Sequence, residues 1–220
     1  MKGARFLVAA VLACALLLMP VAASAQLIDR VLAVVGTVVI TQSDAEAALL
    51  FGLVRPPAPG QDPLRTTLDQ LIRREVVLSE VNRAAAAEVS AASVDKGMAQ
   101  IRSRFASEGE FRAALARTAM TVERLHGMVA DDLRIEEYEQ QRFGTVVTPS
   151  ETEVADYYAS HQADFTEGGR PLTFEQAQPL VRQRLEAARR AVVLAEWVAR
   201  LRRRVDVVDV YFADTSRAPK

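Results

Sequence analysis

The sequence predicts a mainly α-helical protein with a small β-sheet, formed by an N-terminal hairpin and a C-terminal strand. Apolar residues recur at helical spacing through most of residues 64–204. β-branched residues flank Gly36-Thr37 near the start, and apolar residues alternate over residues 205–212 at the end. Because a hairpin is not stable alone, we expect the last strand to pair with it and to bring both chain ends into one sheet.

The hairpin is expected within residues 28–40. Glycine as the first residue of a two-residue turn suits a type II′ turn, because Gly36 can take a positive φ without steric cost. Ser43 and Glu46 have the spacing of a capping box and predict a helix to about Phe51. The proline-rich residues 55–60 then predict an extended loop.

Six further helices are predicted after this loop. Apolar periodicity and capping residues place them over residues 64–87, from Ser90 to about 101, from Ser107 to about 115, from Thr121 to about 143, from Thr148 to about 161, and from Thr173 to about 204. Thr148 is predicted to be the cap of its helix, with Glu151 reaching back to it. A loop containing Gly168-Gly169 is expected between the last two helices.

The first 25 residues have the pattern of a secretory signal peptide. Lys2 and Arg5 precede an uncharged apolar run over residues 6–19, and Ala23-Ser24-Ala25 supplies the small residues before a cleavage site at Gln26. An uncleaved membrane anchor is the alternative, and it is disfavoured because a span needs about 20 apolar residues. A lipoprotein signal is disfavoured because Cys14 lies within the apolar run.

Cleavage would leave a cysteine-free chain, because Cys14 is the only cysteine. Disulfides, thiolate catalysis and cysteine-ligated zinc are then excluded. The remaining 195 of 220 residues suffice for one sizeable core.

Without Lys2 and Arg5, 25 basic residues stand against 28 acidic ones, a net charge of −3, which argues against a nucleic-acid partner. No later segment has the length of a membrane span, so we expect no stable insertion after cleavage.

The sequence contains no recognisable catalytic or cofactor motif, and we expect no cofactor and no metal. The only histidines are His126, expected to be structural or exposed, and His161, expected at a helix C-terminus. His161 and Asp164 could be half of a metal site, but no other histidine lies nearby in the sequence. A protein that is not an enzyme is therefore favoured.

Two features of the last helix allow alternative interpretations. Arg200 and residues 202–204 form a basic run that either binds an anion or lipid head group or is a solvated helix end that complements the dipole; the second is favoured. Trp197 shares a helix face with other apolar residues, so it is expected in the core rather than as a ligand platform.

Four segments resemble the SurA family of periplasmic chaperones, with the related foldases PpiD and PrsA. Residues 28–36 (IDRVLAVVG) and 39–44 (VITQSD) resemble the opening strands and helix start of the N-terminal domain. Residues 68–75 (LDQLIRRE) resemble the helix that follows. Residues 148–154 (TPSETEV) resemble the linker helix before a parvulin domain, and the Trp197 helix with its following strand resembles the family's C-terminal segment.

The resemblance implies a division of the chain into five parts. These are a leader (1–25), a SurA N-terminal-like core (26–147), a linker helix and loop (148–172), a C-terminal helix and strand that complete the core (173–212), and a tail (213–220). In the relatives a parvulin domain is inserted before the C-terminal helix. Here only seven residues separate Phe165 from Thr173, whereas a folded domain needs about 50, so the isomerase domain is expected to be absent.

The resemblance implies an ATP-independent periplasmic chaperone, a holdase that binds unfolded or extended exported polypeptides, outer-membrane proteins above all. Apolar side chains of the middle helices are the candidate client-binding residues, although for each one taken singly a core position is favoured: Phe105, Phe111, Leu115 and Met120. Two alternatives stay open. One is a peptidyl-prolyl isomerase with weak or partner-dependent activity, and the other is an assembly module for one folded envelope partner. The sequence leaves the oligomeric state and the client preference open.

Overall fold

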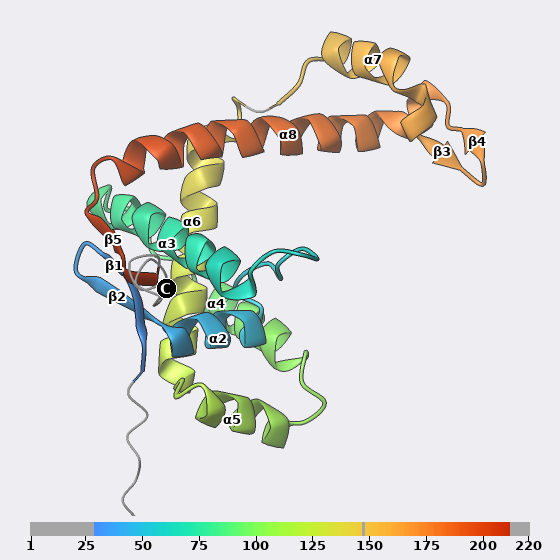
Figure 1. Cartoon of the computed structure of the whole chain (residues 1–220). Helices are drawn as coiled ribbons and strands as arrows, with labels where there is room; N and C mark the ends of the chain where they lie inside the picture. The colour runs from blue at the N-terminus through green and yellow to red at the C-terminus, as the bar shows by residue number, and fades with distance from the viewer. Residues whose placement is uncertain (1–28, 147, 212–220) are drawn as a thin grey trace, which may run out of the picture.

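The computed structural model describes residues 29–146 and 148–211, and it is mainly helical with a small antiparallel sheet, as predicted (Figure 1). The predicted leader, the cleavage site and residues from Phe212 on lie outside this range. The helices are α2 (Gln42–Phe51), α3 (Pro63–Arg83), α4 (Ala91–Arg102), α5 (Glu108–Arg117), α6 (Val122–Phe143), α7 (Glu151–Ser160) and α8 (Phe174–Arg202). The strands are β1 (Val31–Val35), β2 (Val38–Thr41), β3 (Thr166–Glu167), β4 (Arg170–Pro171) and β5 (Val207–Asp209).

The two ends of the described chain meet in one sheet of order β2-β1-β5, which confirms the predicted pairing. Val34 of β1 lies opposite Val39 on one side and Val208 on the other. Gly36 has φ 58° in the two-residue turn, as the predicted type II′ geometry requires. Its amide donates to the carbonyl of Asp206 at 2.8 Å, so the hairpin tip is fastened to the segment that enters β5.

The start of α2 differs from the prediction. Thr41 is the cap: its hydroxyl accepts from the amide of Asp44 at 3.3 Å, and the Asp44 carboxylate accepts from the Thr41 amide at 3.0 Å. The predicted cap, Ser43, is instead hydrogen-bonded through its hydroxyl to the Asp29 carboxylate. Thr41 and Ser43, two capping candidates separated by one residue, thus have different partners, and the local sequence pattern could not show which of them caps the helix.

The start of α7 shows the same kind of difference. Ser150 is the cap and forms a capping box with Glu153. Thr148 was the predicted cap, but its hydroxyl donates to the carbonyl of Gly144 at 3.1 Å. The predicted box of Thr173 with Gln176 is confirmed at the start of α8.

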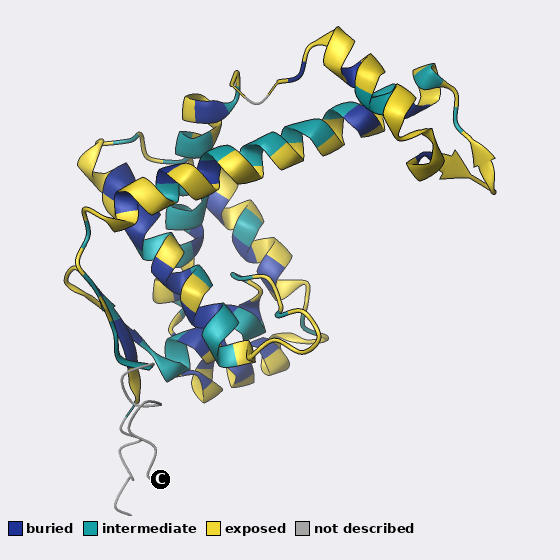
Figure 2. Ribbon diagram, turned by 45° about the horizontal axis from the view of Figure 1, so that its top comes forward, coloured by how far each residue is buried: buried dark blue, intermediate teal, exposed yellow. Residues whose placement is uncertain are grey.

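Two cores form the body of the molecule (Figure 2). The first packs the inner face of the sheet against α3 and the C-terminal half of α8. Trp197 is only 3 % exposed there, with its ring centroid 5.3 Å from that of Phe143, so its predicted core position is confirmed. The second core joins α2, α4, α5 and the first half of α6 around Phe51 and Leu125.

A third core lies outside this body. The first half of α8 projects from the body and carries α7 and the β3-β4 hairpin at its far end (Figure 1). Buried side chains hold this arm together: Val154, Phe165, Ala177 and Val181. The segment predicted as a linker helix and loop therefore packs around a core of its own. The expected loop at Gly168-Gly169 is the turn of a small hairpin.

Ion pairs fasten α7 along α8. Glu151 lies 2.6 Å from Arg182, and Asp164, after α7, lies 3.1 Å from Arg184. Glu153 is bonded to Arg189. The hydrogen bonds of Ser150 to the Glu153 carboxylate, together with Arg189, lower the pKa of Glu153 to about 2.

Candidate functional site

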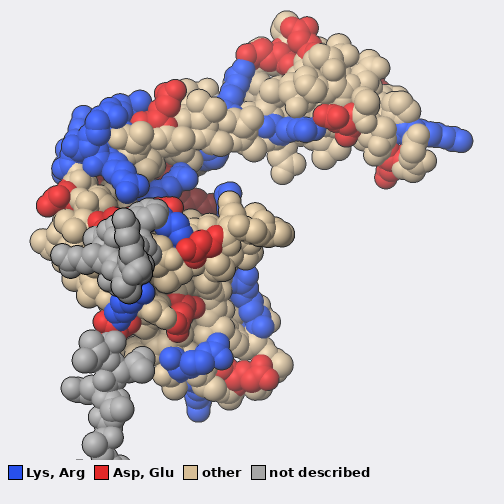
Figure 3. Space-filling model, in the orientation of Figure 1, with Lys and Arg blue, Asp and Glu red and all other residues tan. Residues whose placement is uncertain are grey.

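A groove of about 950 Å³ lies on the body, where α8 contributes Arg190 and Leu194 from the half of the helix that packs on the body. Its walls come from the loop between α2 and α3, from α3, from the middle of α6, and from α8. In the space-filling view the arm overhangs the body, with open space beneath it (Figure 3). A groove with four walls and an open side can admit an extended chain from solvent.

The lining of the groove combines an apolar set with a charged set. The apolar side chains are Leu53, Val54, Pro56, Ala58, Val77, Ile135 and Leu194. The charged side chains are Arg55, Asp69, Arg73, Arg74, Asp132, Glu136, Glu139 and Arg190. Four are basic and four are acidic, so the lining has no net charge and gives no preference for a strongly charged ligand.

The loop that forms one wall is held by a side-chain amide. Gln70 accepts a hydrogen bond from the Arg55 amide and donates to the Arg55 carbonyl, both at 2.9 Å. This pairing satisfies the backbone of Arg55 as a neighbouring strand would. Proline at residues 56 and 57 restricts the following backbone to extended geometry. The proline-rich loop predicted from sequence is therefore an ordered wall of the groove.

A cluster of charges joins α3 and α6 at the base of the groove. The Arg74 side chain lies 2.6 Å from both Glu75 and Asp132, and it donates to the Met128 carbonyl at 3.1 Å. Arg74 is only 11 % exposed. Burial raises the pKa of Asp132, and the attraction of Arg74 opposes that rise. The cluster fixes the spacing of two groove walls.

Glu139 is a second partly buried acid in the groove. Burial raises the pKa of its carboxyl, the nearby charges of Arg73 and Arg190 oppose the rise, and Glu136 adds to it. Within residues 29–146 and 148–211, no basic side chain comes within 4 Å of the Glu139 carboxylate. Glu139 is therefore available to a donor that enters the groove.

The four residues predicted to bind clients lie elsewhere. Phe111, Leu115 and Met120 are buried in the second core, and Phe105 is half-buried against it. The Phe105 and Phe111 rings pack on each other at 5.5 Å and both contact the Phe51 ring. In this conformation they form the core that the sequence also allowed, rather than a surface. Periodicity identified an apolar helix face, but it could not show that α2 and α6 cover it.

The histidines do not converge on other reactive groups. His126 is exposed on α6. His161 follows the last turn of α7, as predicted, and stacks on Tyr157 with ring centroids 4.1 Å apart. Asp164 pairs with Arg184 rather than with His161. In the described part of the chain, no group of three His, Cys, Asp or Glu side chains could hold a metal ion.

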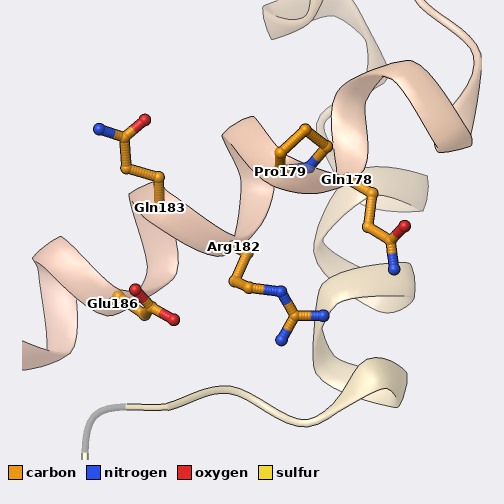
Figure 4. Close-up of a pocket in the computed structure, with 5 residues that line it drawn as sticks. All are labelled: Gln178, Pro179, Arg182, Gln183 and Glu186. Carbon is orange, nitrogen blue, oxygen red and sulfur yellow. The ribbon is translucent and has the colours of Figure 1, made fainter. Parts of the chain in front are cut away.

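A smaller hollow of about 370 Å³ lies on the arm (Figure 4). It is lined by one face of α8: Gln178, Pro179, Arg182, Gln183 and Glu186. Arg182 is already bonded to Glu151, and Gln178 donates to the same carboxylate at 2.9 Å. Two of the four polar side chains of this hollow therefore serve the packing of α7, and the groove is the stronger candidate site.

Sequence reasoning missed the groove, apart from its proline-rich wall. Its lining extends from Leu53 to Leu194, and no local motif links these positions.

No helix in the described ranges is long and apolar enough to cross a membrane. Comparison with known protein families and with curated proteins finds no significant match to this chain.

Proposed function

We propose that this protein is an ATP-independent chaperone that holds unfolded exported polypeptides in the groove between α3, α6 and α8. The observation that carries the proposal is the groove itself, which combines apolar side chains, balanced charges and an open side. An unfolded chain offers apolar side chains and unsatisfied backbone groups, and such a groove can contact both. The resemblance of the sequence to the SurA family supports the same activity, with outer-membrane proteins as clients and the periplasm as the compartment.

Binding in this proposal is reversible and driven by apolar contact. A client segment would lie against Leu53, Val54 and Ile135, while Glu139 accepts a hydrogen bond from the client backbone. A holdase that binds the unfolded state keeps it from aggregating by mass action and needs no nucleotide. The charged side chains among the apolar ones limit the free energy of binding, so a client can leave and fold.

The test measures suppression of aggregation for several unrelated unfolded proteins, including an unfolded outer-membrane β-barrel, without ATP. The variant V54D/A58D places two charges in the groove wall and should weaken client binding at least tenfold. The control V192D/A116D makes the same two changes at exposed positions outside the groove lining, and it should bind clients like the unmodified chain. Equal loss in both variants, or no suppression by the unmodified chain, would refute the proposal.

The same preparation separates the alternatives. Turnover of a proline-containing peptide by the purified protein would favour an isomerase. Tight binding to one native envelope protein, without protection of unrelated unfolded chains, would favour an assembly module.

A further inference from the structure

The C-terminal end of α8 carries a basic cluster that the groove does not use. Arg200, Arg202, Arg203 and Arg204 are all exposed. In the space-filling view, basic side chains gather at the C-terminal end of α8, on a projecting corner of the body (Figure 3). Arg202, Arg203 and Arg204 have no carboxylate within 4 Å in the part of the chain that the structure describes.

The helix end accounts for only part of this cluster. A helix C-terminus gains from basic residues in its last turn, and Arg200 and Arg202 occupy that turn. Arg203 is the C-cap residue, and Arg204 lies beyond the helix on the segment that leads to β5. The whole chain has a net charge of −1, so these residues form a local excess rather than part of a generally basic surface.

Exposed valines lie on the sheet whose last strand, β5, follows the arginines in the chain. Val39, Val34 and Val208 are in register across the sheet, and the two on the edge strands are 48 % and 51 % exposed. Val208 follows Arg204 by four residues, which is at most about 14 Å of extended chain. The hydrogen bond from Gly36 to Asp206 holds the hairpin tip against the same segment. Val208 therefore lies on the short segment that follows the arginines, and Val39 lies on the same sheet at its other edge.

We propose that this corner docks the protein on an anionic phospholipid surface. Arginines beside exposed apolar side chains are the combination that binds interfacially: the cations attract lipid head groups, and the apolar groups enter the boundary of the acyl region. A fluid bilayer can fit a projecting corner, whereas an acidic peptide would need a groove to bury its backbone. Docking by this corner leaves the groove open, so the inference goes beyond the holdase proposal.

The test is flotation with vesicles of phosphatidylcholine containing about one-third phosphatidylglycerol, compared with phosphatidylcholine alone. It uses the chain from residue 26, because the apolar run over residues 6–19 would itself enter lipid. The described cores use residues from Leu32 on, so this form keeps them. We expect binding to the anionic vesicles only, and loss of binding at about 0.5 M salt through screening.

The variant R202Q/R203Q/R204Q should weaken vesicle binding on the order of a hundredfold, since each arginine near an anionic surface contributes about fivefold. The matched control R112Q/R117Q/R170Q removes the same charge at exposed positions elsewhere and should retain most of the binding. V39T/V208T keeps β-branched side chains in the strands and should weaken binding by up to roughly tenfold.

Several results would overturn the proposal: equal binding to neutral vesicles, no vesicle binding, an unchanged affinity of V39T/V208T, or equal losses in the two arginine variants. Stronger binding to polyglutamate than to vesicles, lost in R202Q/R203Q/R204Q, would assign the corner to an acidic protein instead. None of these results changes the outcome of the aggregation assay, so the two proposals fail independently.

Discussion

Replacing Arg74 by methionine removes the cation at the centre of the cluster between α3 and α6. Methionine keeps an unbranched apolar stem but lacks the guanidinium, so Glu75 and Asp132 lose a partner 2.6 Å away, and the Met128 carbonyl loses a donor. Removing one partner of a buried ion pair typically costs about 3–5 kcal/mol. Because Asp132 retains 34 % of its side-chain exposure, water compensates part of this loss, and we expect about 2–4 kcal/mol.

Thermal unfolding followed by circular dichroism measures this cost. For a chain of this size, each kcal/mol shifts Tm by about 2–4 °C, so R74M should melt roughly 5–15 °C lower. The control R73M changes the adjacent exposed arginine, which has no ion pair within 4 Å among the described residues, and should shift Tm by less than about 2 °C. The double variant R74M/D132N should recover part of the loss, because it removes the unpaired acid.

The pH dependence gives an independent check. Without Arg74, burial should raise the pKa of Asp132 further above its unfolded value. A carboxyl whose pKa is raised by folding stabilises the native state as pH falls through that pKa. The deficit of R74M relative to the unmodified chain should therefore shrink in mild acid. If R74M melts like R73M at neutral pH, the cluster makes no net contribution and the reasoning is refuted.

Three further predictions concern the backbone and the arm. G52A should cost about 1–2 kcal/mol in chemical denaturation, because residue 52 has φ 67° and an added Cβ would collide with the Arg104 guanidinium; unchanged stability would contradict this geometry. A chain ending before Val205 should lose cooperative thermal unfolding, because β5 is absent; an unchanged melting curve would count against the shared sheet. E153Q should weaken the NMR-observed order of α7. In the unmodified chain, the contribution of Glu153 is complete above its unfolded pKa and is lost as pH falls toward about 2, so acid-insensitive α7 signals would exclude this role.

Much of the fold follows from local sequence. The hairpin turn, the positions of the helices and the pairing of the terminal strands each depend on short patterns: Gly36-Thr37, apolar periodicity, and alternation after residue 205. Prediction failed where neighbouring residues compete for one role. Ser43 and Thr148 have the chemistry of helix caps, but each bonds to a group that the helix pattern does not include.

The site was far less predictable. Phe111 and Leu115 have the spacing of an exposed binding face as well as of a core face, and only the positions of α2 and α6 decide between them. The groove depends on how α3, α6 and α8 cross, which is set by packing between distant segments. Gln70 is a clear example: its bonds to the Arg55 backbone join residues 15 positions apart, and no motif predicts them.

The hairpin at the end of the arm makes this chain a convenient scaffold for engineering. Thr166 of β3 pairs with Pro171 of β4, so the chain enters and leaves the tip of this hairpin at neighbouring positions. Among residues 29–146 and 148–211, nothing lies within 4 Å of an added Cβ at Gly168 or Gly169. A folded module spliced between these glycines would sit outside all three cores, at the far end of the arm from the sheet. The chain could thus gain a second activity while its body folds as before.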